Sequence, residues 1–262
     1  MTIYRHLVLR QQGGEQSGGF QNKEQSHHRQ PYLFTTNYNM KYITIIPARG
    51  GSKRFPGKNI QLFAGHPLIV HSIEYSLSNK HIAKTYVSTD SLEIKRISEG
   101  YGAVVLDRPK ELAGDYVTTA AVLADAAKTL TERGEDFDYM VLLQATNPLR
   151  PSELLDDAIK IIESGKYDSL MTVSRDPRKL GKIIDGKFTP WNYTFGMRSQ
   201  DMEPLYFENG LLYITSKEQI LQGRLMGENM YPMITNHIYG EIDVDTPEDL
   251  DYAEYVLANN KK

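Results

Sequence analysis

The chain contains no cysteine, so disulfide bonds and thiolate chemistry are excluded. It also lacks any apolar run that approaches the roughly 18 residues of a membrane-spanning helix, and no signal-peptide-like hydrophobic region begins the sequence. Neither sign of charge is in large excess, because 30 Lys and Arg residues stand against 33 Asp and Glu residues. We therefore expect a cytoplasmic protein with no nucleic-acid partner and no membrane partner.

The composition of the 262 residues, 40% hydrophobic and 24% charged, is that of a globular protein. This length suits one large α/β domain, or one domain with an extra lobe. Residues 1–39 are rich in Gln, Gly, Ser and His without sustained periodicity, which predicts a disordered N-terminal extension. The folded domain is predicted to occupy residues 40–262.

Strand-like apolar patterns alternate with helical patterns along most of the folded part. Strands are predicted at residues 41–46, 85–89, 103–106, 139–143 and 169–173, and helices at 67–77, 91–99, 118–130 and 152–162. Such alternation predicts an α/β fold, a Rossmann-like, doubly wound and mostly parallel sheet with helices on both faces. In sheets of this kind, ligands bind at the carboxyl ends of the strands.

The alternation breaks between residues 175 and 208, where turn residues and aromatics predict a small β-rich lobe. Trp191, Tyr193 and Phe195 lie in this lobe. Two interpretations stay open from spacing alone. Either these aromatics pack against a second subunit, or they fill the core of their own subunit.

Residues 45–59 join a predicted strand to a loop that carries three glycines and four cations. Glycines let backbone N–H groups approach an anion closely, and Arg or Lys side chains neutralise its oxygens. The segment therefore predicts a phosphate-binding loop with a nucleoside triphosphate as its ligand. It is not the ordinary phosphate loop, since Asn59 stands where that motif has a hydroxyl, and it holds no dinucleotide fingerprint. The alternative is a glycine-rich turn with solvated cations.

Two aspartates, Asp243 and Asp245, lie two residues apart at the end of a strand predicted at 241–244, so both carboxylates are expected on one side. Two hard oxygen ligands on one face suit Mg²⁺, which takes substrate phosphates and water as its other ligands. The alternative is a pair of solvated charges before a helix N-terminus. A helix is predicted to follow, with Thr246 as its cap, Pro247 at its first position and Asp249 completing a capping box.

Four segments resemble, in order, the motifs of the acylneuraminate cytidylyltransferases, the family that makes CMP-sialic acids. They are residues 45–59, 108–115, 144–150 and 242–250, within a resemblance that covers about residues 40–257. The third segment is similar to Gln-Pro-Thr-Ser-Pro-Leu-Arg, but Ala145 and Asn147 replace the Pro and the Ser. Because these two residues lie beside Gln144, we hypothesise that they alter the sugar preference.

The resemblance implies roles for the matching residues. The implied nucleotide-binding residues are Arg49, Gly50, Gly51, Ser52, Lys58, Asn59, Arg108 and Thr119. The implied catalytic residues are Lys58, Arg49, Asp243 and Asp245, the two aspartates also serving as Mg²⁺ ligands. Gln144 and Asn209 match positions at the acceptor sugar, although Asn209-Gly210 is also an ordinary turn pair. Asp115 belongs to the second motif, or it caps the helix that follows it.

The implied reaction is attack by the anomeric hydroxyl of a nine-carbon 2-keto-3-deoxy sugar acid on the α-phosphorus of CTP, with release of pyrophosphate. The proton acceptor is either an oxygen of the aspartate pair or a metal-bound hydroxide. Arg175, Arg178 and Lys179 are candidate partners for the carboxylate of the sugar acid. The resemblance also implies a homodimer that uses the inserted lobe.

Two alternative functions remain at this point. The first is activation of the eight-carbon octulosonate sugar by a sister enzyme, whose loop usually reads Tyr-Gly-Ser-Thr-Arg and whose later motif reads Gln-Gly-Asp. The second is a catalytically inactive nucleotide-binding module on the same fold. The presence of Arg49, Lys58, Asp243 and Asp245 disfavours that module.

Overall fold

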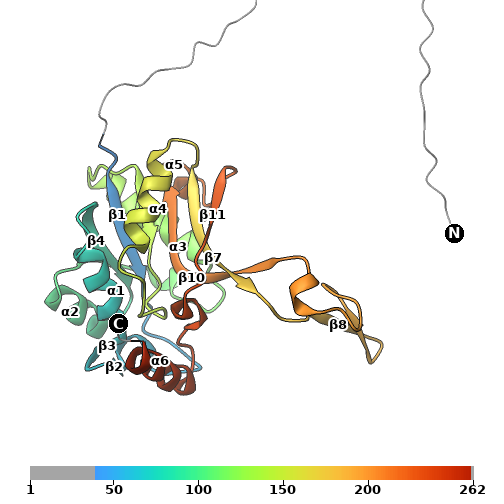
Figure 1. The fold of residues 1–262 in the computed structure, drawn as a ribbon. Coiled ribbons are helices and arrows are strands. Elements are labelled where there is room, and N and C mark those ends of the chain that lie inside the picture. Colours follow the sequence, from blue (N-terminus) through green and yellow to red (C-terminus); the bar gives the residue numbers. More distant parts are fainter. Residues whose placement is uncertain (1–38, 261–262) are drawn as a thin grey trace, which may run out of the picture. The chain divides into compact units, whose positions relative to one another are not determined.

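The computed structural model describes residues 39–260. Its centre is a seven-stranded sheet in the order β11-β7-β10-β6-β1-β4-β5 (Figure 1). The strands are β1 (Tyr42–Pro47), β4 (Ile82–Thr89), β5 (Val104–Asp107), β6 (Tyr139–Leu142), β7 (Ser169–Asp176), β10 (Leu205–Ser216) and β11 (Met230–Ile234). β10 runs antiparallel to both of its neighbours, whereas the other pairs in this sheet are parallel. The predicted extension, residues 1–39, lies outside the described residues except for residue 39.

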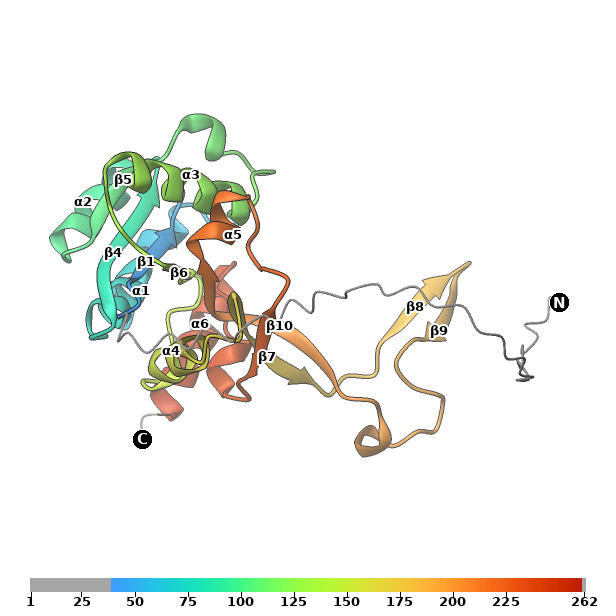
Figure 2. The same ribbon diagram turned by 90° about the horizontal axis from the view of Figure 1, so that it is seen from above.

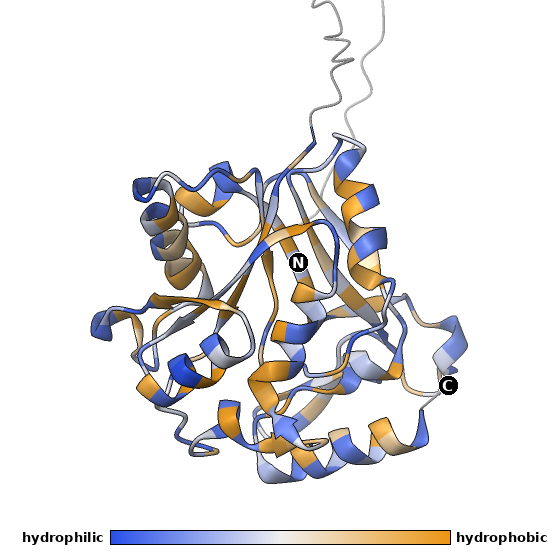
Figure 3. Cartoon of the chain, turned by 90° about the vertical axis from the view of Figure 1, so that its left-hand side faces the viewer, coloured by the Kyte–Doolittle hydropathy of each residue, from blue (hydrophilic) through white to orange (hydrophobic). Residues whose placement is uncertain are grey.

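Helices cover both faces of this sheet. One face packs against α1 (Leu68–Leu77), α2 (Leu92–Gly100) and α4 (Leu154–Glu163), and the other against α3 (Thr119–Glu132) and α5 (Lys217–Leu221). β1 is apolar on both faces because each face is covered, and Ile45 and Ile46 belong to the two different core clusters. Apolar positions recur along the helices in Figure 3, as amphipathic helices require. The predicted doubly wound α/β fold is confirmed.

The C-terminal helix α6 (Pro247–Asn259) begins with the predicted capping box. Thr246 Oγ1 accepts a hydrogen bond from the Asp249 backbone N–H, and the Asp249 carboxylate accepts one from the Thr246 backbone N–H. α6 packs its apolar side over the short hairpin of β2 (Leu62–Phe63) and β3 (His66–Pro67), where Phe63 and Ala253 share a core cluster. No helix within residues 39–260 is long and apolar enough to cross a membrane.

The strand predicted at 241–244 is wrong. A short 3₁₀ helix, η4 (Ile238–Glu241), occupies its start, and the extended backbone after it pairs with a loop instead of a strand. The Val244 N–H donates to Thr146 O over 2.8 Å. Alternation survives without the strand, because Ile242 and Val244 are buried while Asp243 and Asp245 lie on the opposite side.

Residues 177–204, here called the arm, connect β7 to β10 and extend away from the central sheet (Figures 1 and 2). The arm contains a two-stranded antiparallel hairpin of β8 (Gly181–Ile184) and β9 (Lys187–Pro190), followed by the 3₁₀ turn η3 (Ser199–Asp201). The ring of Phe188 lies over Gly181, in the space that a Cβ at this position would occupy. Trp191 and Phe195 are 61% and 75% exposed, so they do not fill the core of their own subunit.

Candidate active site

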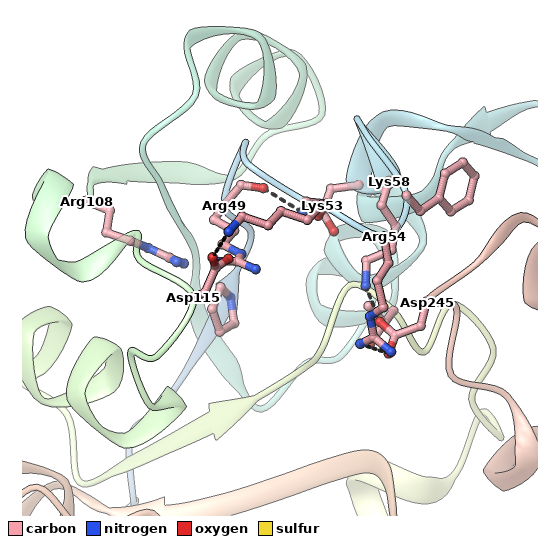
Figure 4. Close-up of a pocket in the computed structure, with 12 residues that line it drawn as sticks. Arg49, Lys53, Arg54, Lys58, Arg108, Asp115 and Asp245 are labelled. Carbon is pink, nitrogen blue, oxygen red and sulfur yellow. Dashed lines mark hydrogen bonds and ion pairs between the residues drawn. The ribbon is translucent and has the colours of Figure 1, made fainter.

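A cavity of about 370 Å³ lies where the loop after β1 meets the ends of other parallel strands. Its walls come from four segments that are distant in sequence: the loop after β1, the segment after β5, the loop after β6 and the segment before α6 (Figure 4). The lining residues are Pro47, Arg49, Ser52, Lys53, Arg54, Phe55, Lys58, Asn59, Arg108, Asp115, Thr146 and Asp245. The cavity therefore lies at the carboxyl edge of the sheet, as the fold class predicts.

The loop after β1 is shaped by its glycines and by one asparagine. Gly57 adopts φ +66°, a left-handed conformation that favours glycine, and the 3₁₀ helix η1 (Lys58–Ile60) starts directly after it. Asn59 Nδ2 donates to Arg49 O over 3.0 Å and so ties the two ends of the loop together. The Gly50 N–H donates to the Asp90 carboxylate over 2.9 Å, whereas a Cβ on Gly51 would meet open space.

Two carboxylates hold four of the cations that line the cavity (Figure 4). Asp245 accepts from Lys58 Nζ over 2.6 Å at one oxygen and from the Arg54 guanidinium at the other. The two cations differ in environment, since the Lys58 side chain is 12% exposed and that of Arg54 is 73% exposed. A buried cation of this kind interacts with a bound anion more strongly than a solvated one.

Asp115 holds the second pair of cations. Arg49 donates to one of its oxygens over 2.9 Å, and Lys53 forms an ion pair with the other. Hydrogen bonds from Lys53 and then Arg49 hold the pKa of Asp115 below its ordinary value. The interpretation of Asp115 as a helix cap is wrong, because Thr118 Oγ1 caps α3 by accepting from the Ala121 N–H over 3.2 Å.

Arg108 enters the cavity from the end of β5. Its guanidinium donates to Ser88 O over 2.7 Å and to Ser88 Oγ over 3.2 Å. Burial lowers its pKa, and it forms no ion pair with a carboxylate of the described residues. Arg108 is therefore a fixed cation whose charge no carboxylate neutralises directly.

Asp243 and Asp245 lie on the same side of the segment that precedes α6. Although Asp243 as a residue is exposed, burial of its carboxyl group among protein atoms raises its pKa, and the charge of Asp245 adds to this effect. A hydrogen bond with Thr146 and the charge of Lys58 act in the opposite direction. Asp243 does not line the cavity described above.

These two carboxylates fit a Mg²⁺ site of the kind that substrate phosphates complete. Their oxygens are hard ligands, and both carboxylates lie on the same side of the segment before α6. Within residues 39–260 no cluster of three or more His, Cys, Asp or Glu side chains could hold a metal by itself. Mg²⁺ at this position would therefore depend on oxygens of the nucleotide and on water.

The remaining predicted site residues lie outside the lining of the cavity. Thr119 is half-buried at the first position of α3. Gln144 follows β6, and its side-chain oxygen accepts from Thr146 Oγ1 over 3.4 Å. Asn209 lies inside β10, so the interpretation as an ordinary turn pair is wrong. Gly210 has φ +73° within an irregularity of the β10–β7 pairing.

The Asn209 side chain is buried, and both its oxygen and its nitrogen are hydrogen-bonded. Its oxygen accepts from Thr172 Oγ1 over 2.6 Å and from the Leu211 N–H over 3.2 Å, and its amide donates to Ser174 Oγ over 3.0 Å. These bonds fix the irregular part of β10. The predicted contact of Asn209 with a sugar stays a prediction.

The motif at 144–150 contains residues whose individual roles sequence reasoning missed. Thr146 lines the cavity, and Arg150 is a buried cation without an acidic partner among the described residues. Arg150 donates to Leu211 O, Ser72 Oγ and Gln144 O over 2.6 to 3.0 Å, and burial lowers its pKa to about 10. Only the position of this motif at the end of an apolar strand could have indicated these roles.

The fold and the cation-lined cavity define a nucleotide-binding α/β protein, and comparison with known proteins specifies it further. A sequence model of the cytidylyltransferase family matches residues 43–261. CMP-N,N'-diacetyllegionaminic acid synthase of Legionella pneumophila is 34% identical, over 85% of this chain and 99% of that protein. Pseudaminic acid cytidylyltransferase of Campylobacter jejuni is 30% identical, over 84% of this chain and 98% of that protein. The chain belongs to the cytidylyltransferase family and is a nucleotidyltransferase.

Other relatives agree with this assignment. N-acylneuraminate cytidylyltransferase of Streptococcus agalactiae is 32% identical over 80% of this chain, which spans about half the length of that relative (52%). Among solved structures, a CMP:2-keto-3-deoxy-manno-octonic acid synthetase complexed with CTP has a TM-score of 0.63 at 16% identity, covering 84% of this chain and 99% of its own. At that identity the likeness shows the fold alone. The predicted family is confirmed. The three relatives compared by sequence are named for legionaminic acid, pseudaminic acid and N-acylneuraminate, which are nine-carbon sugar acids (nonulosonic acids).

Proposed function

We propose that this enzyme transfers CMP from CTP to the anomeric hydroxyl of a nine-carbon 2-keto-3-deoxy sugar acid and releases pyrophosphate. The observation that carries the proposal is the cavity at the carboxyl edge of the sheet, with its five cations next to the Asp243 and Asp245 pair. The names of the full-length relatives, which act on legionaminic and pseudaminic acids, support a nonulosonic acid as the acceptor.

The charges of the cavity suit a triphosphate. Five cations line it, Arg49, Lys53, Arg54, Lys58 and Arg108, against the two carboxylates of Asp115 and Asp245, which leaves three positive charges. A nucleoside triphosphate carries about four negative charges and accepts charge-assisted hydrogen bonds from such donors. We infer that the phosphates replace the carboxylates as partners of the exposed cations when CTP binds.

Lys58 is the cation best placed to act on the transition state. It is the most buried partner of Asp245, and it follows directly after the left-handed Gly57, which fixes its backbone. A positioned cation stabilises the negative charge that builds on the transferred phosphoryl group, since it needs no reorganisation during the reaction. Arg49 and Arg108 would hold the other phosphate oxygens.

The aspartate pair would hold Mg²⁺ together with the nucleotide. When bound, Mg²⁺ neutralises phosphate charge and orients the α-phosphorus for in-line attack. Asp245 already contacts Lys58, so the same carboxylate keeps this cation beside the phosphates. Thr146 holds the neighbouring Asp243 through a side-chain hydrogen bond.

The carboxylate of the sugar acid needs a cation of its own, and Arg175 is our candidate. Arg178 is already bound through two hydrogen bonds to Asp176, at 2.8 and 2.9 Å, and Lys179 Nζ donates to Met197 O. Arg175 has no side-chain hydrogen bond or ion pair with the described residues. It lines a second cavity of about 360 Å³, together with His237 and Glu241. Arg175→Ala is expected to raise the KM for the sugar acid and leave the KM for CTP unchanged.

The arm supports a homodimer. It carries five apolar side chains that are between 48% and 79% exposed: Ile183, Ile184, Phe188, Trp191 and Phe195. Apolar groups of this size are stabilised when a partner buries them. A second copy of the chain is the partner we propose, and the cytoplasm is the compartment we propose.

Pyrophosphate release with CTP and Mg²⁺ tests the proposed function. The panel of acceptors contains N-acetylneuraminate, its deaminated analogue, legionaminate, pseudaminate and the eight-carbon octulosonate. We expect release with one nine-carbon acid, and with CTP in preference to ATP. Release with the octulosonate alone would replace the proposed acceptor. If no acceptor gives pyrophosphate release although CTP still binds, the alternative of a catalytically inactive nucleotide-binding module would be favoured.

A further inference from the structure

Asn147 is almost completely buried, with 1% of its surface exposed, although its side chain is polar. Its Nδ2 donates to Ile242 O over 2.6 Å and to Asn209 O over 3.4 Å. One residue earlier, the backbone oxygen of Thr146 accepts from the Val244 N–H over 2.8 Å. The loop after β6 therefore holds the backbone on both sides of Asp243.

Asn147 also contacts the irregular part of β10. A Cβ added to Gly210 would lie 2.8 Å from Asn147 Oδ1, so the asparagine occupies the space that a side chain at position 210 would need. Asn209, next to it, is tied to β7 by its hydrogen bonds with Thr172 and Ser174. Three segments therefore converge on one side chain: the loop after β6, the irregular part of β10, and the segment before α6.

The oxygen of the Asn147 side-chain amide differs from its nitrogen, because it forms no hydrogen bond with the described residues. This oxygen, Oδ1, is buried. A buried polar atom without a partner costs stability. The two hydrogen bonds that the amide nitrogen donates, to Ile242 O and Asn209 O, offset this cost, so the asparagine acts in this structure as a donor.

We propose that Asn147 is a positioning residue that fixes the carboxylate of Asp243 for metal and nucleotide binding, acting through the backbone of Ile242. This inference rests on the proposed function, in which the aspartate pair holds Mg²⁺. Under this proposal, Asn147 affects the affinity for the metal. It stands where the family motif that residues 144–150 resemble has a Ser. A role in the choice of sugar is not needed to explain the residue.

The test compares three variants of the full chain. Asn147→Asp keeps the size of the side chain but places an oxygen opposite Ile242 O in place of the donor. Asn147→Ser shortens the side chain, so the amide nitrogen that donates to Ile242 O is absent. This variant is used alone if Asn147→Asp does not fold. Ser76→Ala is the matched control. Ser76 is also fully buried, and its hydroxyl is bonded to Thr44 and Thr85 over 2.7 Å each, but it lies outside the cavity.

The first readout is kinetic. We expect N147S and N147D to raise the Mg²⁺ concentration for half-maximal rate at least about fivefold, with the KM for CTP at saturating Mg²⁺ changed less than about twofold. S76A is expected to lower the melting temperature without changing the Mg²⁺ requirement. Unchanged Mg²⁺ requirements in both Asn147 variants, or an equal shift in S76A, would overturn the proposal.

The second readout does not depend on turnover. Amide hydrogen exchange of residues 242–245 reports on the bond from Val244 N–H to Thr146 O. We expect exchange there to be at least about tenfold faster in N147S than in the wild type, and to be slowed less by Mg²⁺ with CTP. If the wild type is inactive with every sugar acid, the proposed function fails while this measurement still decides the role of Asn147. Equal exchange in the wild type and N147S would refute that role.

Discussion

Lys58→Ala is the substitution that most directly tests the assignment of the cavity. It removes the cation that contacts Asp245 over 2.6 Å and whose side chain is 12% exposed. Arg54→Ala is the matched control, because Arg54 pairs with the other oxygen of the same carboxylate but is 73% exposed. The two variants remove the same charge from the same site and differ mainly in the burial of that charge.

The expected magnitudes follow from this difference in burial. Two unit charges about 4 Å apart interact by about 4 kcal/mol in the partly buried environment of a protein and by about 1 kcal/mol in water. Loss of one preorganised transition-state donor typically costs about 10²–10³ in kcat. We therefore expect K58A to lower kcat at least about 100-fold, and R54A to lower it less than about tenfold, since about 1 kcal/mol is roughly fivefold.

The assay is steady-state pyrophosphate release at saturating CTP and Mg²⁺, with melting temperatures as a folding control. K58A is expected to stay folded, because Arg54 still pairs with the Asp245 carboxylate. A K58A turnover within about fivefold of the wild type would remove Lys58 from the mechanism. A loss in R54A as large as that in K58A would refute the reasoning from burial.

Three further predictions concern stability and assembly. The folded-state pKa of Asp115 is lowered by Lys53 and Arg49, so its stabilising effect is present above the ordinary pKa and is lost as the pH falls through the folded value. D115N is therefore expected to melt below the wild type at pH 7 and together with it in acid, as scanning calorimetry would show. T246A is expected to cost about 1 kcal/mol in urea unfolding, because it removes the cap of α6. In size-exclusion chromatography we expect the wild type to elute as a dimer and the double variant W191D/F195D as a monomer, since both side chains are exposed on the arm. If both proteins elute as dimers, the arm is not the interface.

The sequence predicts the elements of this fold well where local signals decide them. The cap and the capping box of α6 involve residues only three apart, and they formed as expected at Thr246 and Asp249. The continuous apolar run of β6 identifies a strand covered on both faces, which the structure confirms. Local chemistry also supplied the phosphate-binding interpretation of the loop after β1, since glycines and cations follow one another there.

Local signals fail where the partner of a segment is distant. Residues 242–244 alternate like a strand, but their partner is the turn at Thr146, so no ladder forms. The pair Asn209-Gly210 has the composition of a turn, yet β10 continues through it because Thr172 and Ser174 bind the asparagine from β7. The periodicity of apolar residues in the sequence predicts which side chains are buried. It does not predict which segment the backbone pairs with.

The site itself depends on contacts that no spacing rule could supply. Lys58 and Asp245 are 187 positions apart, and Arg49 and Asp115 are 66 apart. These pairs meet because parallel strands place all their carboxyl ends at one edge of the sheet, so each following loop adds its charges to the same cavity. The fold class therefore predicts that the motifs converge, whereas the choice of partners is decided by burial. Asp245 lies between a buried lysine and an exposed arginine. Under the proposed function, this asymmetry would keep Lys58 beside the aspartate pair and leave Arg54 free to turn toward an incoming phosphate.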